Sequence, residues 1–180
     1  QFRDNTSLRP PVDLRNADVR INVHVQETYV TVSLDSSGES LHRRGYKKFA
    51  HPASLSEVLA AGMVMITGYT GGRPLRNPMC GSGTIAIEAA MIASGVYPGA
   101  MGRSYCFQNW PDYDAVLFER LKESLPPPRQ PAHPIFATDS DPEAVRMTKN
   151  NARVAGLDAL IEVKKENFLA SGDIRETALL

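Results

Sequence analysis

Three groups of residues in this chain have the chemistry to bind a small, partly charged ligand. Gly81 and Gly83 lie in a run of small residues before an apolar stretch, while Asp139 and Asn167 each follow a short apolar run. Glycines let a backbone turn sharply and approach a ligand, and N–H groups at a helix start favour an anionic or carboxylate-bearing group. A carboxylate such as Asp139 can accept hydrogen bonds from both hydroxyls of a ribose.

Alternating strands and helices are expected to position these groups. Hydrophobic periodicity predicts three short strands and two helices in alternation, over residues 73–79, 84–94, 135–138, 142–156 and 160–163. Such an alternation is typical of an α/β fold with a parallel sheet and right-handed crossovers. In an open parallel sheet the ligand lies at the carboxyl ends of the strands, where all three groups occur.

Asp139 also has a purely structural interpretation, as the cap of the helix that follows it. Asp141 suits that cap better, because Pro142 then takes the first helical position, where proline is favoured. We therefore expect the Asp139 carboxylate to remain available to a ligand.

Nicotinamide dinucleotides and S-adenosylmethionine both suit a site of this kind. The dinucleotide fingerprint has the form G-x-G-x-x-G, with an acidic residue about 20 residues later. Here the third glycine is missing, and Asp139 lies much further than that beyond Gly83. The spacing favours a ligand with adenosine at one end and an amino acid at the other.

The residues before the glycine turn predict a hairpin and a helix. Alternation of apolar and polar residues over 19–25 and 29–34 is typical of two half-buried strands joined by a short link. A helix is predicted over residues 54–67, with Ser54 and Glu57 as a capping box. Its start is expected near the glycine turn. Its apolar stripe comprises Leu55, Val58, Leu59, Gly62, Met63 and Ile66.

Two further segments have alternative interpretations. Residues 41–48 place four cationic side chains around Gly45 and Tyr46, which would suit RNA phosphates and a base, but composition favours a solvated surface loop. Residues 96–134 interrupt the alternation and include a predicted helix over 112–125 that begins at Asp112. Their aromatic residues, Phe107 and Trp110, are expected to pack in a core rather than stack on bases.

Composition limits the classes of protein to which the chain can belong. The 180 residues are 42% hydrophobic, and Lys plus Arg equal Asp plus Glu at 20 each, so no overall charge indicates a nucleic-acid partner. No signal peptide or long apolar run is visible, which predicts a cytoplasmic setting. Cys80 and Cys106 lack zinc-site spacing, so reduced cysteines and no metal are expected. The chain starts without methionine and ends without a terminating pattern, so a piece of a longer protein is expected.

The run Asn77-Pro-Met-Cys-Gly-Ser-Gly-Thr84, followed by Ile87-Glu-Ala-Ala-Met-Ile92, closely resembles the cofactor motif of the THUMP-containing RNA methyltransferases. More narrowly, it is similar to the bacterial 23S ribosomal RNA guanine-N2 methyltransferases of the L type. Residues 34–46 resemble the family's junction between the THUMP-containing region and the catalytic domain. The runs at 55–61, 138–141 and 150–152 also fall in family order, and the resemblance covers residues 19–168.

The resemblance implies a Rossmann-like class I methyltransferase domain that binds S-adenosylmethionine. Its first half would occupy residues 49–180, after a THUMP-region remnant and linker over 1–48. Asp139 would bind the ribose, Ser140 would lie beside the adenine, and Asn167 with Phe168 would contact the adenine. The methionine part would be surrounded by Asn77, Pro78, Met79, Cys80, Gly81, Ser82, Gly83 and Thr84.

The chain departs from the family pattern at three points. Asn167 stands where many relatives carry aspartate, and Ser54-Leu-Ser-Glu57 stands where relatives often have Pro-Leu-Lys-Glu. The Asn-Pro-Pro-Tyr type loop that holds the target amino group does not occur in the 180 residues, so the catalytic residues stay unknown. The expected parent is an enzyme that methylates the exocyclic N2 of a guanine in 23S ribosomal RNA, and a transfer RNA guanine is the alternative substrate. The alternatives are a non-catalytic RNA-binding module that keeps the fold, and a nicotinamide-binding domain.

Overall fold

The computed structural model describes residues 12–13, 17–51, 53–170 and 178–179. The chain divides into two compact units. The hairpin unit comprises residues 1–39 and 104–118, and the sheet unit comprises residues 40–103 and 119–180. No helix among the described residues is long and apolar enough to cross a membrane.

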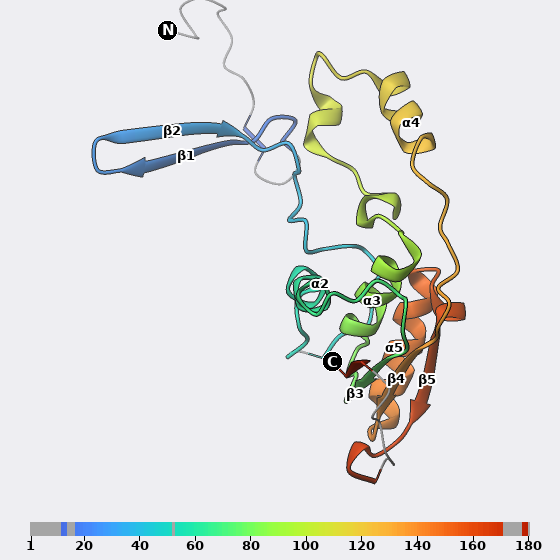
Figure 1. Ribbon diagram of the computed structural model, residues 1–180. Coiled ribbons are helices and arrows are strands. Elements are labelled where there is room, and N and C mark those ends of the chain that lie inside the picture. Colours follow the sequence, from blue (N-terminus) through green and yellow to red (C-terminus); the bar gives the residue numbers. More distant parts are fainter. Residues whose placement is uncertain (1–11, 14–16, 52, 171–177, 180) are drawn as a thin grey trace, which may run out of the picture. The chain divides into compact units, whose positions relative to one another are not determined.

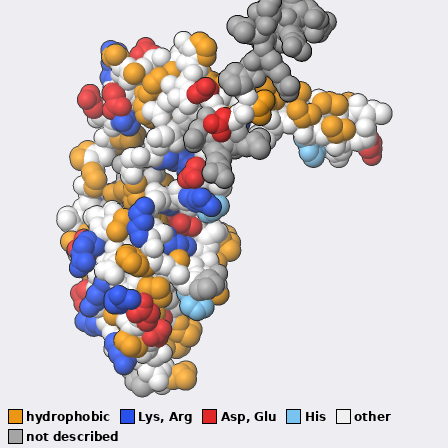
Figure 2. Space-filling view, turned by 180° about the vertical axis from the view of Figure 1, so that it is seen from behind, with side chains coloured by type: hydrophobic (Ala, Val, Ile, Leu, Met, Phe, Trp, Pro, Cys, Tyr) orange, Lys and Arg blue, Asp and Glu red, His pale blue; other side chains and the backbone are white. Residues whose placement is uncertain are grey.

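In the hairpin unit, strands β1 (Ile21–Gln26) and β2 (Tyr29–Leu34) form an antiparallel pair. This confirms the predicted hairpin and its two-residue link (Figure 1). One face of the pair is apolar, because Val23 lies opposite Val32 and Val25 opposite Val30. That face was expected to be buried, but every residue of both strands is exposed. Figure 2 shows hydrophobic side chains along the hairpin.

Residues 104–118 complete the hairpin unit. Their short 3-10 helix η2 (Cys106–Asn109) packs next to the turn after β2, where the Phe107 N–H donates to the Ser36 carbonyl at 3.2 Å. A Cβ added at Gly38 would lie 2.8 Å from the Cys106 sulfur, so this approach requires glycine. The rings of four residues contact one another at centroid distances of 5.3–6.4 Å: Tyr105, Phe107, Tyr113 and Phe118. The expected packing role of Phe107 is confirmed.

Helix α4 (Ala115–Glu123) starts later than predicted. The Asp114 carboxylate accepts a hydrogen bond from the Leu117 N–H at 2.9 Å, which is the capping contact expected from Asp112. Both aspartates suit a cap by residue type, and the backbone conformation decides between them.

The sheet unit holds four parallel strands in the order β5-β4-β3-β6 (Figure 1). The parallel arrangement of β3, β4 and β5 was predicted, but their order in the sheet was not. Their bounds are β3 (Leu75–Pro78), β4 (Ile135–Asp139), β5 (Ile161–Lys165) and β6 (Ala178–Leu179). Leu75 lies opposite Ile135, which lies opposite Ile161, and all three side chains are buried. The carboxyl ends of β3 and β4 therefore meet at one edge of the sheet.

Helices α3 (Thr84–Ser94) and α5 (Pro142–Val154) follow β3 and β4, contact each other and both contact β4. The predicted ends of α3 are confirmed, with Gly95 in a left-handed conformation at its C-terminus. The predicted start of α5 is confirmed as well, since the Asp141 carboxylate accepts from the Glu143 N–H at 2.9 Å.

Helix α2 (Glu57–Ile66) packs on α3 and corrects two predictions. Its cap is Ser56, whose hydroxyl accepts from the Leu59 N–H, so the capping box of Ser54 and Glu57 is wrong. The predicted stripe is wrong too, because the buried residues are Glu57, Ala60 and Val64, while Val58, Leu59, Met63 and Ile66 are exposed. A small residue such as Ala60 lets α2 approach α3 closely, which a hydropathy pattern does not register.

Candidate cofactor-binding site

The glycine turn connects β3 to α3 through a tightly folded backbone. Met79 follows the last residue of β3 with a positive φ of 57°, and its side chain is 73% exposed. The turn closes where the Gly83 N–H donates to the Cys80 carbonyl at 2.8 Å. The Cys80 N–H donates to the Thr138 carbonyl of β4 at 2.9 Å, so the turn is fixed to the neighbouring strand.

Gly83 is required by both conformation and space. Its φ of 83° is unfavourable for any residue with a side chain. An added Cβ would lie 2.7 Å from Cγ2 and 3.2 Å from Cα of Thr148 on α5. Gly81 also has a positive φ, of 58°, but faces open space. The turn therefore rests directly on α5 at Gly83.

Side chains of α5 hold the carbonyl groups of the turn. The Thr148 hydroxyl donates to the Gly81 carbonyl at 2.9 Å, and the Asn151 amide donates to the Ser82 carbonyl at 2.9 Å. The Thr148 oxygen also lies 3.4 Å from the Cys80 sulfur. Burial raises the pKa of the Cys80 thiol to about 11, so the thiol stays protonated near neutral pH. Cys80 is therefore a packing residue rather than a thiolate nucleophile.

Asp139 joins the ends of β3 and β4. One carboxylate oxygen accepts from the Gly81 N–H at 2.9 Å, and the other accepts from the Asp141 N–H at 3.0 Å. The sequence had indicated that the Asp139 carboxylate remains available to a ligand. In the structure it already has two protein partners, and one of them is the Gly81 N–H of the glycine turn. A carboxylate offers about four acceptor positions, so two remain for hydroxyl groups of a ligand.

A cavity of about 270 Å³ lies at the glycine turn. Eleven residues line it: His51, Ala53, Ser54, Leu55, Asn77, Met79, Cys80, Gly81, Ser82, Thr84 and Ile85. The Ser54 and Ser82 hydroxyls share a hydrogen bond across the cavity lining. The expectation that the start of α2 would lie near the turn is confirmed. A volume of this size suits one end of a ligand rather than a whole nucleoside derivative.

The cavity includes most of the predicted residues at the turn, but not those at the other strand ends. Ser140 is exposed, and the Asn167 side chain accepts from the Leu169 N–H at 3.0 Å. Phe168 is half-buried at the start of a short 3-10 helix, η4 (Phe168–Ala170). The assignment of these residues to a ligand stays a prediction. The lining residues that the prediction omitted are His51, Ala53, Ser54, Leu55 and Ile85.

The basic segment 41–48 is not wholly a solvated surface loop, and a contact of the segment with RNA stays a prediction. Tyr46 is only 1% exposed, and its hydroxyl donates to the Glu88 carboxylate at 3.0 Å. Arg44 lies 3.5 Å from the same carboxylate, and Lys47 lies 3.5 Å from Glu57 of α2. These side chains are therefore directed into the sheet unit, where buried carboxylates neutralise the two cations.

Opposing influences act on the pKa of the buried Glu88 carboxylate. Burial raises its pKa, while the charge of Arg44 and the hydrogen bond from Tyr46 act in the opposite direction. Burial, followed by the charge of Glu88, also raises the pKa of the Tyr46 hydroxyl, which therefore stays a donor. The sequence offered no signal for this cluster beyond the single charged residue, Glu88, in an otherwise apolar α3.

Comparison with known proteins places these features in a family. A family model described as the RMKL-like methyltransferase domain UPF0020 matches residues 44–173, and a THUMP domain model matches residues 1–35. The chain is 38% identical over 173 residues to the ribosomal RNA large subunit methyltransferase K/L of Syntrophotalea carbinolica, covering 92% of this chain and 24% of the relative. It is 37% identical over 170 residues to a protein of Synechocystis sp. provisionally named an RNA methyltransferase, covering 93% of this chain and 44% of the relative.

Solved structures show the same fold. A protein of Clostridium difficile 630, provisionally described as a methylase, matches 96% of this chain and 46% of its own length, with 30% identity and a TM-score of 0.83. SMU.472, provisionally described as a methyltransferase and crystallised with S-adenosylhomocysteine, matches 87% of this chain and 41% of its own length, with 28% identity and a TM-score of 0.79. The chain spans less than half the length of these relatives. It has the predicted Rossmann-like methyltransferase fold and belongs to the RMKL-like methyltransferase domain family UPF0020.

Proposed function

We propose that this chain carries the cofactor half of an S-adenosylmethionine-dependent RNA methyltransferase that modifies the exocyclic N2 of a guanine in 23S ribosomal RNA. The observation that carries the proposal is the cavity at the carboxyl end of β3, with Asp139 at the adjacent strand end. Membership of the RMKL-like family supports the reaction class, and the name of the Syntrophotalea carbinolica relative supports a ribosomal RNA substrate. We also propose a boundary after Lys48 between the THUMP-region remnant and the methyltransferase domain, and a cytoplasmic setting.

The residues present fit one end of S-adenosylmethionine. The cavity has hydroxyl groups from Ser54, Ser82 and Thr84, which can bind an amino acid's charged groups. Asp139 keeps acceptor capacity for the ribose hydroxyls, because the Gly81 and Asp141 amides occupy only part of it. We assign the adenine to Ser140, Asn167 and Phe168.

S-adenosylmethionine supplies an activated methyl group on a sulfonium, which transfers directly to a nitrogen nucleophile. The task of this chain is then to bind and orient, because alignment of reacting groups supplies much of the rate enhancement in such a transfer. The backbone of the turn is fixed by β4 on one side and by α5 on the other. The protonated Cys80 thiol offers no competing nucleophile beside the methyl donor.

Calorimetric titration of the full-length parent protein with S-adenosylhomocysteine tests the site. We expect Asp139→Ala to weaken binding by about 1–3 kcal/mol, the scale of a lost charge-assisted hydrogen bond. Asp141→Ala is the matched control, since it removes a carboxylate that caps α5 and should leave affinity unchanged. If a folded Asp139→Ala variant binds S-adenosylhomocysteine as tightly as the wild type, Asp139 is not part of the site. If the wild type binds NAD more tightly than S-adenosylhomocysteine, the cofactor assignment is wrong.

Methyl transfer from labelled S-adenosylmethionine tests the reaction. The parent protein should label 23S ribosomal RNA, and nucleoside analysis should return N2-methylguanosine. Labelling of transfer RNA instead of 23S ribosomal RNA would show that transfer RNA is the substrate. RNA binding without any methyl transfer would favour the non-catalytic module.

A further inference from the structure

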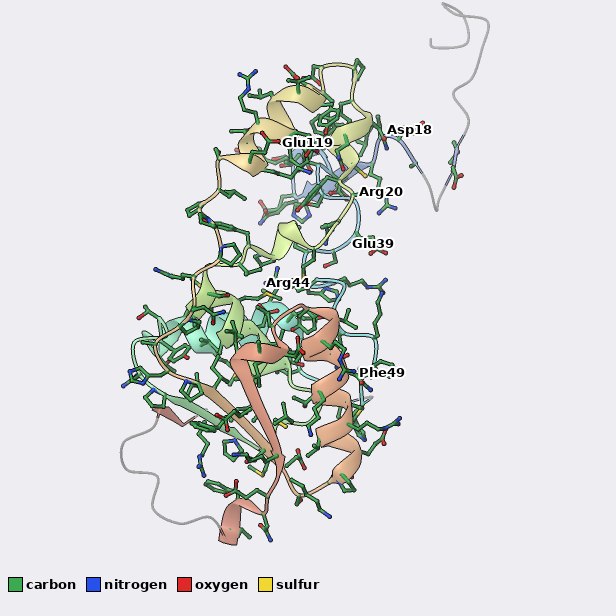
Figure 3. The ribbon with its side chains drawn as sticks, turned by 90° about the vertical axis from the view of Figure 1, so that its right-hand side faces the viewer. Asp18, Arg20, Glu39, Arg44, Phe49 and Glu119 are labelled. Carbon is green, nitrogen blue, oxygen red and sulfur yellow. The ribbon has the colours of Figure 1, made fainter. Side chains whose placement is uncertain are left out.

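Asn151 on α5 is fully buried, yet it carries a polar amide that the proposed function does not use. Its side-chain oxygen accepts from the Lys48 and Phe49 N–H groups, both at 3.1 Å. Its side-chain nitrogen donates to the Phe49 carbonyl at 2.7 Å and to the Ser82 carbonyl at 2.9 Å. An amide has two acceptor and two donor positions, so these four bonds use its whole capacity. Phe49 lies beside α5 (Figure 3).

One partner of Asn151 lines the cavity, and another lies next to a segment that lines it. Ser82 lies in the glycine turn, which forms one wall. Phe49 leads into a second wall, which comprises His51, Ala53, Ser54 and Leu55. One side chain of α5 therefore bonds to the backbone of the turn and to the backbone that leads into the second wall.

Other contacts of the second wall agree with this arrangement. Lys47 donates to the Leu55 carbonyl at 2.5 Å and pairs with Glu57, and the Ser54 hydroxyl bonds to that of Ser82. The wall is held at both ends, by Asn151 near Phe49 and by Lys47 near Leu55. His51, Ala53 and Ser54, which lie between them in the chain, line the cavity.

We propose that Asn151 is a positioning residue that sets the width of the cavity for the amino-acid end of S-adenosylmethionine. This inference rests on the proposed function. Loss of the Asn151 bonds releases the Phe49 backbone and leaves the Ser82 carbonyl without this donor, so the second wall moves relative to the turn. The ribose end of the ligand, assigned to Asp139, does not depend on this contact.

The test compares two ligands in the full-length parent protein. S-adenosylhomocysteine carries the amino-acid end, whereas 5′-methylthioadenosine lacks it. Asn151→Asp keeps the size of the side chain but replaces its donor nitrogen with an oxygen that faces two carbonyls. We expect S-adenosylhomocysteine to bind about tenfold more weakly, which is the scale of one or two lost hydrogen bonds. Binding of 5′-methylthioadenosine should be unchanged.

Asn150→Asp is the matched control, because Asn150 is the adjacent residue and its amide oxygen accepts from Arg153 of the same helix, at 3.4 Å. It should bind both ligands like the wild type. Asn151→Ser, which keeps one donor and one acceptor, serves if Asn151→Asp does not fold, and should show the same ligand difference. Equal weakening of both ligands, or of neither, would overturn the positioning role alone. Failure of the wild type to bind S-adenosylhomocysteine would overturn the proposed function and this inference together.

Discussion

The hairpin unit and the sheet unit use strands in opposite ways. All twelve residues of β1 and β2 are exposed, including the apolar face around Val23 and Val32. In the sheet unit, three of the four residues of β3 are buried, and its carboxyl end carries the cavity. Strand patterns therefore predict which side chains are suited to burial, but burial itself depends on a second layer, which α3 and α5 provide for β4.

The comparison predicts that one substitution at the glycine turn lowers the free energy of unfolding more than any substitution in the hairpin. Gly83→Val should destabilise the chain by about 3 kcal/mol or more, because it adds a strained backbone conformation to a clash with Thr148. Gly81→Ala, at the same kind of φ but with open space, should cost about 1 kcal/mol. Chemical denaturation measures both. Similar losses for the two variants would show that α5 does not restrict the turn.

Substitution of Glu88, the buried carboxylate on α3, should have the next largest effect on the free energy of unfolding. Glu88→Leu leaves the Tyr46 hydroxyl and Arg44 without this acceptor, and we expect a loss of about 2–4 kcal/mol. Urea unfolding near neutral pH measures it. Arg44→Gln should then also lower stability, whereas an RNA contact by Arg44 would instead change the salt dependence of RNA binding.

Glu88 also predicts a dependence of stability on pH. Its pKa is raised in the folded state, so its contribution is fully present below the unfolded carboxyl pKa and is lost as pH rises through the folded value. Glu88→Gln should remove this decrease in stability with rising pH. Glu143→Gln is a control of opposite sign, because a hydrogen bond from Arg146 lowers the pKa of Glu143. Unfolding curves at several pH values measure the slopes, and an unchanged slope in Glu88→Gln would contradict the prediction.

The smallest effect is expected in the hairpin. Val23 is 60% exposed, so Val23→Ala should change the free energy of unfolding by less than about 0.5 kcal/mol. Val64→Ala replaces a valine of α2 that is fully buried, and should cost about 2 kcal/mol. Thermal unfolding of the two variants compares the units directly. A comparable loss for Val23→Ala would show that the apolar face of the hairpin is covered in solution.

Local patterns predicted the strands and helices that position the site, and most of their ends to within about two residues. Gly95 and Asp141 mark helix ends in the structure as they do in the sequence, because left-handed glycine and an aspartate before Pro142 act through adjacent residues. Errors occurred where two neighbouring residues suited the same role. Ser54 and Ser56 both suit a cap, and only Ser56 accepts from the backbone of α2.

By itself, the sequence determined the order of the elements, the glycine turn at the end of β3 and the resemblance to RNA methyltransferases, because each depends on residues close together in the chain. Only the tertiary structure decided that Asp139 holds the Gly81 amide, that Arg44 and Tyr46 share Glu88, and that Asn151 joins Phe49 to Ser82. These contacts join residues that are far apart in the chain. The physical reason is that buried polar groups must find partners, and the fold alone determines which of them are within reach.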